Sequence, residues 1–175
     1  MKKLYSGTIG TIVFSDEYKA PISFVRDVLI DTDKGKIVAF VVNKKSKTVI
    51  IPLDIRAFST FLHVSNPSVM IEAKDVVRLN DVLLNDIPVI SNDVYTESGK
   101  YLGEVNDFVY ETQTLQIEKI FVRKNFFGFF NIDKRIILAK DIIVINKDKI
   151  IVKDDDATVK VKEKAVENEK ELAIA

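Results

Sequence analysis

The sequence predicts a mainly β protein in which one small β unit is built twice and is followed by a charged tail. The first observation is an internal repeat: residues 25–42 return eighty positions later at 105–122, with Asp27 opposite Asp107. Because a fixed period marks a repeated structural unit, the repeat outweighs any local pattern. The second is that short runs rich in Val, Ile and Thr alternate with polar turns, which is typical of strands. The third is a change of composition near residue 154.

These observations divide the 175 residues into three parts. We expect a first domain at 1–82, a second at 83–153 and a tail at 154–175. The tail opens with three aspartates and has no aromatic residue, Gly or Pro. Its charges both support and oppose a helix, so we expect a frayed helix or a disordered segment. Deleting residues 156–175 should then leave the thermal midpoint nearly unchanged.

The overall composition narrows the class of protein. Hydrophobic residues make up 47% and charged residues 30%, enough for two cores and an ordinary soluble surface. Lys+Arg and Asp+Glu are both 26, so a generic nucleic-acid binder is disfavoured. There is no cysteine, which fits a reducing compartment, and no apolar run long enough for a membrane span. The N-terminus is interrupted by polar residues and glycines, so we interpret it as mature structure. We expect a cytoplasmic protein.

The elements of the first unit follow from apolar runs and turn residues. The return strand of its central hairpin is apolar at every position, which predicts that both of its faces are covered. Gly35 supplies the positive φ that the hairpin loop needs. In order, we expect strands at 8–14, 24–30, 37–42 and 48–52, a basic tip at 43–47, a helical turn at 54–58, a closing segment at 69–71 and a connection at 73–86.

The second unit repeats this order with one insertion. Residues 123–134, RKNFFGFFNIDK, replace the basic tip NKKSK and are longer by about seven residues. We expect the unit to begin near 83–90. It should continue with a central hairpin of 101–110 and 115–122, a strand at 135–139 and a final hairpin at 142–152.

The repeated motifs resemble the PRC-barrel family. Gly99 to Asp107, GKYLGEVND, is similar to the family's G-x-x-hydrophobic-G-x-V-x-D motif, and both 51–55 and 138–142 are similar to its apolar-x-x-acid-apolar segment. The first unit departs from the pattern where Ser23 stands opposite Gly103, so we expect a different bend there. The resemblance covers residues 4–153.

This resemblance implies two tandem small closed β-barrels without catalytic residues or a cofactor of their own. Members of the family occur in the cytoplasmic subunit of photosynthetic reaction centres, in a ribosomal small-subunit maturation factor and in archaeal cell-division complexes. In each case the barrel is a docking module, and the fold does not choose between these roles.

The residues themselves give no catalytic or metal signature. The loop that begins Asp31-Thr-Asp33 lacks the later ligands of a calcium loop, so we interpret it as a hairpin turn. His63 is the only histidine and is expected to be structural or exposed. Asp154 to Asp156 is interpreted as a solvated linker. We therefore expect no enzyme activity, no metal, no cofactor and no small-molecule substrate.

Two features are candidate docking surfaces. One is the aromatic insertion, which either folds back over its barrel or fills the seam between the two domains, or else meets a partner or a bilayer. The other is the pair of basic tips, which are either solvated turns or contacts for RNA phosphates or anionic lipid. The candidate residues are Phe126, Phe127, Phe129, Phe130, Lys44, Lys45, Lys47, Arg123, Lys124, Lys134 and Arg135.

The return strands also predict a seam between the two units. Phe40 and Val42, with Ile120 and Val122, should point into the cores. The opposite faces keep large apolar residues at the same two positions in both repeats, with Ala39 between them in the first and Lys119, expected at the rim, in the second. We therefore expect the units to pack through these faces, or else to bind a partner or a second copy there. The seam residues are Ile37, Val41, Ile117 and Phe121.

Taken together, these patterns favour a non-enzymatic protein-interaction adaptor whose partner is another protein. Two alternatives stay open. An RNA- or ribosome-associated factor would use the basic tips. A peripheral membrane adaptor would insert the aromatic insertion.

Overall fold

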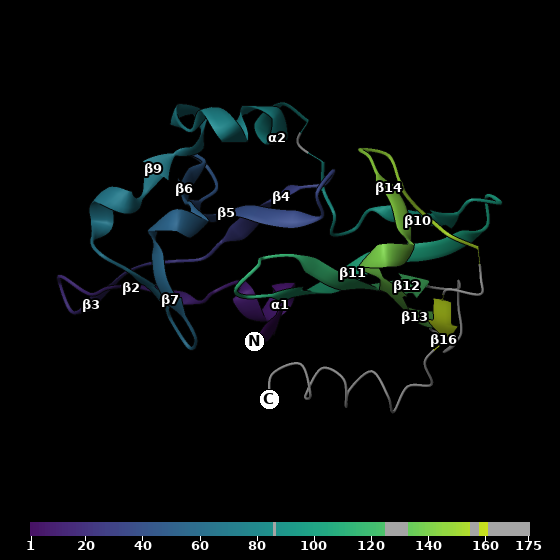
Figure 1. Ribbon diagram of the computed structural model, residues 1–175, viewed down its shortest axis with the longest axis horizontal. Helices are drawn as coiled ribbons and strands as arrows, with labels where there is room; N and C mark the ends of the chain where they lie inside the picture. Colours follow the sequence, from purple (N-terminus) through teal and green to yellow (C-terminus); the bar gives the residue numbers. More distant parts are fainter. Residues whose placement is uncertain (86, 125–132, 155–157, 161–175) are drawn as a thin grey trace. The chain divides into compact units, whose positions relative to one another are not determined.

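The computed structural model describes residues 1–85, 87–124, 133–154 and 158–160, and the chain forms two compact units (Figure 1). The first-repeat unit comprises Gly7–Asp31 and Lys36–Asp86. The second-repeat unit comprises Ile87–Ala175 together with Thr32–Gly35 and Met1–Ser6. We call Met1–Ser6 the N-terminal arm. The sequence assigned this arm to the first domain, whereas its contacts place it in the second-repeat unit.

The first-repeat unit contains two four-stranded sheets, with the strand orders β3-β2-β8-β7 and β4-β5-β6-β9. All neighbours are antiparallel except β2 and β8, which are parallel. The strands are β2 (Ile12–Ser15), β3 (Ala20–Phe24), β4 (Asp27–Asp31), β5 (Lys36–Asn43), β6 (Thr48–Ile50), β7 (Ile55–Phe58), β8 (Leu62–Val64) and β9 (Ile71–Glu72). The helical turns are α1 (Tyr5–Thr8), η1 (Pro52–Asp54), η2 (Pro67–Val69), η3 (Ala73–Asp75), η4 (Val77–Leu79) and α2 (Asn80–Asn85), and α1 begins in the N-terminal arm.

The second-repeat unit is one sheet with the order β14-β15-β10-β11-β12-β13-β16, and β1 of the N-terminal arm pairs with β11 beside this path. Here β10 and β15 are the parallel pair. The strands are β1 (Lys2–Leu4), β10 (Asp93–Thr96), β11 (Tyr101–Glu111), β12 (Ile117–Lys124), β13 (Asp133–Leu138), β14 (Ile142–Ile145), β15 (Ile150–Val152) and β16 (Thr158–Lys160), with the turn η5 (Ala139–Asp141). Within the described residues, none of the three sheets closes on itself by strand pairing.

The repeat extends to the backbone conformation of single residues. Gly35 has φ 59° in the first central hairpin, and Leu115, eighty positions later, has φ 61° in the second. Lys19 (φ 52°) and Gly99 (φ 85°) correspond in the same way. Glycine adopts positive φ without steric cost, whereas Leu115 and Lys19 hold it against their own Cβ atoms. The turn geometry is therefore repeated even where the glycine is not.

The two units differ where the sequence predicted a different bend. In the second-repeat unit, β11 runs without interruption through Gly103, which has φ 127°. In the first-repeat unit, the corresponding chain is broken into β3 and β4, and Ser23 lies in β3. Because serine rarely adopts the φ of Gly103, the first unit does not follow the same path. One continuous strand joins the halves of the second sheet, whereas the first unit has two separate sheets.

The return strands β5 and β12 occupy the cores, as their composition predicted. Phe40 and Ile120 are fully buried, and Val42 and Val122 are nearly so. The opposite face of each strand is also covered. In the first-repeat unit, Val41 packs in a cluster whose buried members include Ala73 and Leu79 of the connecting segment, which Figure 1 shows running through α2 beside β4 and β5. In the second-repeat unit the cover comes from a different part of the chain.

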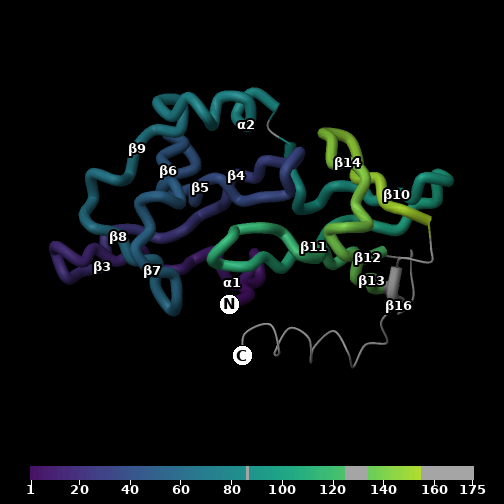
Figure 2. The backbone as a smooth tube through the Cα atoms, in the orientation of Figure 1, coloured from purple at the N-terminus to yellow at the C-terminus, as the bar shows by residue number. Residues whose placement is uncertain are grey.

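Leu4 of the N-terminal arm covers that second face. It forms a buried cluster with Val109, Phe121 and Ile136. In Figure 2 the purple N-terminal residues lie beside the green strand β11, in agreement with the pairing of β1 and β11. Corresponding faces of the two units are thus covered by different segments, one after the first repeat and one before it.

Three local predictions were wrong. Residues 8–14 do not form one strand, because the chain makes the turn α1 before β2 begins at Ile12. Residues 54–58 are mostly the strand β7, because their backbone pairs with β8. Within the predicted tail, Thr158–Lys160 forms β16 and pairs antiparallel with β13.

Candidate docking surfaces

The first basic tip is an ordered turn whose lysines are exposed. The Asn43 side-chain oxygen accepts hydrogen bonds from the backbone N–H groups of Lys45 (2.9 Å) and Ser46 (3.2 Å), which orders the turn locally. Lys44, Lys45 and Lys47 are exposed, as predicted. Lys44 also forms an ion pair with Asp27 (2.6 Å), so its ammonium is held over β4.

The second basic group does not form a matching tip. Arg123 is exposed, but Lys124 and Lys134 are half-buried. Arg135 lies in β13 opposite Val122, and only 5% of it is exposed. Its assignment to a solvated basic tip was therefore wrong: the strand alternation turns it toward the side where Val122 is buried. The four phenylalanines of the insertion, Phe126, Phe127, Phe129 and Phe130, lie outside the described residues.

Lys124 instead belongs to an aromatic cluster on β10 and β11. Tyr95 and Tyr101 are cross-strand neighbours whose ring centroids lie 5.1 Å apart. The Lys124 ammonium lies 5.2 Å from the Tyr101 ring centroid, and its Nζ donates to the Tyr101 carbonyl (3.2 Å). Burial, and then the neighbouring carboxylate of Asp93, raise the pKa of Tyr101 to about 12. The tyrosine stays protonated and donates to Asp93 (3.2 Å), so the cluster joins strands.

The aspartates of the repeated V-x-D motif organise the backbone in both units. Asp27 accepts a hydrogen bond from the N–H of Val28, and Asp107 accepts one from the N–H of Phe108, both at 2.9 Å. Their remaining oxygens differ in partner: Asp27 pairs with Lys44, and Asp107 accepts from the Ser6 hydroxyl (2.5 Å). Each motif carboxylate therefore orders the backbone next to it and holds one more distant partner, a lysine in the first unit and the N-terminal arm in the second.

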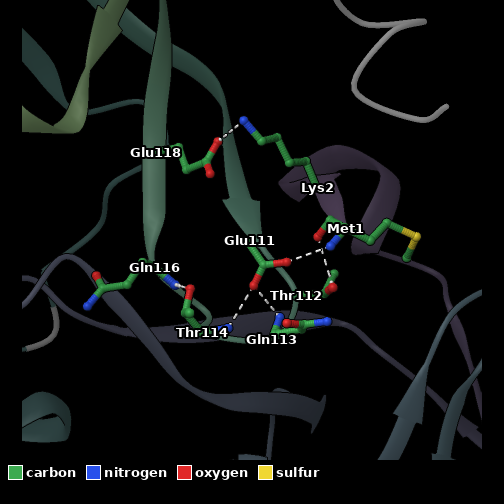
Figure 3. A network of polar contacts seen from close by, with 8 residues as sticks. All are labelled: Met1, Lys2, Glu111, Thr112, Gln113, Thr114, Gln116 and Glu118. Carbon is green, nitrogen blue, oxygen red and sulfur yellow. Dashed lines mark hydrogen bonds and ion pairs between the residues drawn. The ribbon is translucent and has the colours of Figure 1, made fainter.

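The sequence reasoning missed the docking of the N-terminal arm (Figure 3). The Met1 ammonium contacts Glu111 (2.5 Å), Lys2 pairs with Glu118 (2.7 Å), and Thr112 donates to the Met1 carbonyl from its backbone and its hydroxyl (2.8 Å each). The Met1 ammonium and the N–H of Thr114 hold the pKa of Glu111 down at about 2. The sequence does show two lysines followed by a leucine and a serine at this end of the chain. It does not indicate which residues these side chains contact.

The sequence reasoning also missed an exposed apolar edge. Strand β14 ends the sheet order of the second-repeat unit, and Ile143 and Val144 are 48% and 40% exposed. The pairing of β14 with β15 has a bulge at Ile143. In the first-repeat unit, β7 has its bulge at Arg56, and Arg56 and Ala57 are the exposed pair. The same edge carries a charge in one repeat and two β-branched apolar residues in the other.

His63 and Asp31, which the sequence analysis did not assign to a functional site, make ordinary side-chain and backbone contacts. His63 is partly exposed beside the rings of Phe14 and Phe61, and its Nδ1 lies 2.9 Å from an oxygen of Asp16. Asp31 ends β4 and begins the predicted hairpin turn. Across the described ranges no helix has both the length and the apolar character needed to cross a membrane.

The predicted seam residues are buried, and two of them have a cover inside their own unit. Ile37, Val41, Ile117 and Phe121 are all at most 5% exposed. Val41 packs on the connecting segment and Phe121 on Leu4. For Val41 and Phe121, the apolar character from which the seam was inferred therefore has a cause within the unit. The seam itself stays a prediction.

Comparison with known families gives a direct match. The family model described as the PRC-barrel domain matches this chain twice, at residues 4–77 and 88–159. The two matches correspond to the two repeats and confirm the resemblance of the sequence motifs. No curated protein matches the chain.

Proposed function

Because the chain belongs to the PRC-barrel domain family and carries two tandem copies of that domain, we propose that it is a non-enzymatic protein-interaction adaptor. In this proposal each copy is a small closed barrel that works in the cytoplasm and takes no cofactor. The partner is another protein. The observation that carries the proposal is the exposed apolar edge at Ile143 and Val144 of β14.

An edge strand is normally protected by charge, shortness or a bulge, because its free backbone groups invite pairing with another chain. β14 is short and bulged, but it presents isoleucine and valine where β7 presents Arg56 and Ala57. Apolar residues kept at a position where the sister repeat is charged favour a binding role. The two repeats would then divide the work, with the second one docking the partner.

The same geometry favours a protein over a lipid surface at this edge. A sheet edge placed in hydrocarbon would leave backbone N–H and C=O groups without hydrogen-bond partners, each at a cost of several kcal/mol. An extended apolar segment of a protein satisfies those groups by adding a strand and also covers Ile143 and Val144. The membrane alternative therefore depends on the phenylalanines of the insertion, which lie outside the described residues.

The test converts the β14 edge into the β7 edge. Ile143→Arg with Val144→Ala gives the second repeat the surface pair of the first, and Arg56→Ala is the matched control on β7. The parent chain, the control and the double variant are each used to capture proteins from the native host. Proteins that the parent chain and the control capture but the double variant does not are purified and titrated against all three chains. We expect at least one direct binder to lose affinity only with the β14 variant. If every purified binder titrates equally with all three chains, this edge is not the docking surface.

An RNA- or ribosome-associated role is the second candidate, and the exposed lysines of the first tip favour it. Replacing Lys45 and Lys47 with glutamate should weaken RNA binding and reduce its salt dependence if these lysines contact phosphates. Lys44 is left unchanged because it pairs with Asp27. If the parent chain binds RNA no better than this variant, the RNA-associated role is wrong.

A further inference from the structure

The N-terminal arm docks on the second-repeat unit in a way that would serve an arm from another molecule equally well. We propose that two copies of this chain exchange Met1–Ser6, each arm occupying the β11–β12 site of the other copy. The occupant of the site is thus the same six-residue segment in both cases, supplied by the same chain or by a second one. This inference goes beyond the adaptor function and does not depend on it.

The site on β11 and β12 contains every feature that recognises a short extended segment. Lys2–Leu4 adds antiparallel backbone pairing along Val109–Glu111. Leu4 fills the apolar cluster with Phe121, and the arm's two terminal charges meet Glu111 and Glu118. Backbone pairing supplies affinity, and the leucine and the charges supply specificity, as in other strand-addition complexes.

The end of the arm is anchored as specifically as its strand. Ser6 donates to both oxygens of Asp107, from its N–H (3.1 Å) and from its hydroxyl (2.5 Å). The Tyr5 ring lies 5.1 Å from that of Phe108. Asp107 is buried, so an empty site would leave its carboxylate without the Ser6 bonds. The site therefore favours being filled, whichever molecule supplies the arm.

The chain leaves this site directly after Ser6. Gly7 begins the segment that belongs to the first-repeat unit, and Thr8, one residue later, is fully buried. The crossing point lies inside α1, a single turn with a glycine at its third position. Glycine is the least favourable helix residue after proline, costing about 1 kcal/mol relative to alanine, so it weakens this turn. Exchange also requires β1 to leave β11 and Leu4 to leave its cluster, and both contacts form again when the arm of a second copy docks.

Exchange changes no contact at the site, because an arm from a second copy brings the same six residues. Exchange of an identical element is a low-cost route to a dimer, and its extent is governed by hinge strain and protein concentration. The two repeats also give a reason why one arm serves one site: the corresponding face of the first-repeat unit is covered by Ala73 and Leu79. A single arm per chain and a single site per chain make the exchanged pair closed.

Disulfide trapping tests the exchange, because the chain has no cysteine of its own. Lys2 and Glu111 are register partners on β1 and β11, and paired positions of this kind lie within reach of a disulfide. One preparation carries Lys2→Cys and a second carries Glu111→Cys. They are mixed, equilibrated and oxidised. Glu111→Cys mixed with Lys45→Cys, an exposed tip position, measures random collision.

We expect the mixed Lys2→Cys and Glu111→Cys sample to shift from one chain to the mass of two, more than the collision control and increasingly with concentration. A chain carrying both cysteines should close internally when dilute. If the mixture gives no more cross-linked dimer than the control while the double-cysteine chain closes, the arm stays on its own molecule and exchange is wrong. If neither forms, the arm does not dock on β11 and the proposal also fails.

Charge reversal gives a second readout without oxidation. Lys2→Glu places a like charge against Glu118 of its own chain, and Glu118→Lys does the same for Lys2. In an exchanged pair of these two variants, both arms meet opposite charges. Native mass spectrometry should show more heterodimer in the mixture than homodimer in either variant alone. The chain carrying both changes restores the internal pair and should lose this preference; equal dimer fractions in all samples would overturn the proposal.

Discussion

At Gly103 the backbone of β11 passes so close to β12 that a side chain has no space. A Cβ atom built at Gly103 would lie 2.4 Å from the carbonyl oxygen of Arg123, and the residue has φ 127°. Both conditions require glycine, one for conformation and one for the close approach. The glycine therefore allows β11 to continue through the bend as one strand.

Gly103→Ala should lower the free energy of unfolding by about 1–3 kcal/mol through backbone strain alone, with the overlap on Arg123 adding to it. Gly99→Ala is the matched control, because Gly99 also has positive φ but a Cβ there meets nothing within 4 Å. Urea unfolding of both variants separates strain from overlap. Equal losses at the two positions would show that the approach to Arg123 relaxes without cost.

Glu111 should make the stability of the second-repeat unit sensitive to acid. Its pKa is lowered from 4.5 to about 2, first by the Met1 ammonium and then by the N–H of Thr114. A carboxyl group whose pKa is lower in the folded state stabilises the fold above its unfolded pKa, and this contribution is lost as the pH falls through the folded pKa. The loss is expected between pH about 4.5 and about 2.

Unfolding midpoints of the parent chain and Glu111→Gln across that window measure this contribution. The parent should exceed the variant near neutral pH, and the difference should shrink as acid protonates Glu111. A difference that is constant with pH would assign the effect to something other than ionisation of this carboxyl.

At the scale of elements, the sequence predicted those strands whose own composition decides them. β5 was found because residues 37–42 are all apolar, which indicates a strand covered on both faces, and β12 was found because residues 115–122 align with that strand in the repeat. β7 and α1 were not found, because their conformation depends on partners distant in sequence. β7 is a strand since β8 pairs with it, and α1 forms where Ser6 reaches Asp107.

The candidate site shows the same limit. The exposed lysines of the first tip follow from a polar run between strands, so sequence alone located them. Arg135 was predicted both in the strand at 135–139 and in a basic tip, and its burial was missed because it depends on the pairing of β13 with β12, where Arg135 stands opposite Val122. Ile143 and Val144 were placed in the final hairpin at 142–152 without a prediction of their exposure, because exposure at a sheet edge depends on which strand ends the sheet.

The strand β16 changes the prediction for the tail. Thr158–Lys160 pairs with Arg135–Ile137, so these residues complete the edge of the second sheet. Removing 156–175 should cost on the order of 1–3 kcal/mol, the value of two or three backbone hydrogen bonds, whereas removing only 161–175 keeps β16. Urea unfolding of the two truncated chains gives the difference. Equal stability would mean that β16 contributes nothing in solution.

For the whole molecule, the repeat was predictable and the path of the N-terminal arm was not. Residues 25–42 and 105–122 align by residue class, and the strand orders of the two units correspond element by element. The arm has no counterpart in that alignment because each unit covers its outer face in its own way. Leu4 covers Phe121 in one unit, and Leu79 covers Val41 in the other. The repeat predicts the strands that both units share, but it does not predict the segment that covers the outer face of each unit.

The arm therefore predicts an effect far from its place in the sequence. Deleting residues 2–6 removes the burial of Leu4, worth about 1.5–3 kcal/mol, and the β1 pairing with Val109–Glu111. Amide hydrogen exchange should accelerate in β11, β12 and β13, while β2 and β3, which follow the deletion directly, keep their protection. Leu4→Ser is the milder companion variant and should loosen the same strands to a smaller extent, because it keeps the backbone pairing. If protection is lost first in β2 and β3, the arm stabilises its neighbours in sequence. If β11 exchanges as in the parent chain, the arm stabilises neither unit. Either result would show that its place on the second sheet is wrong.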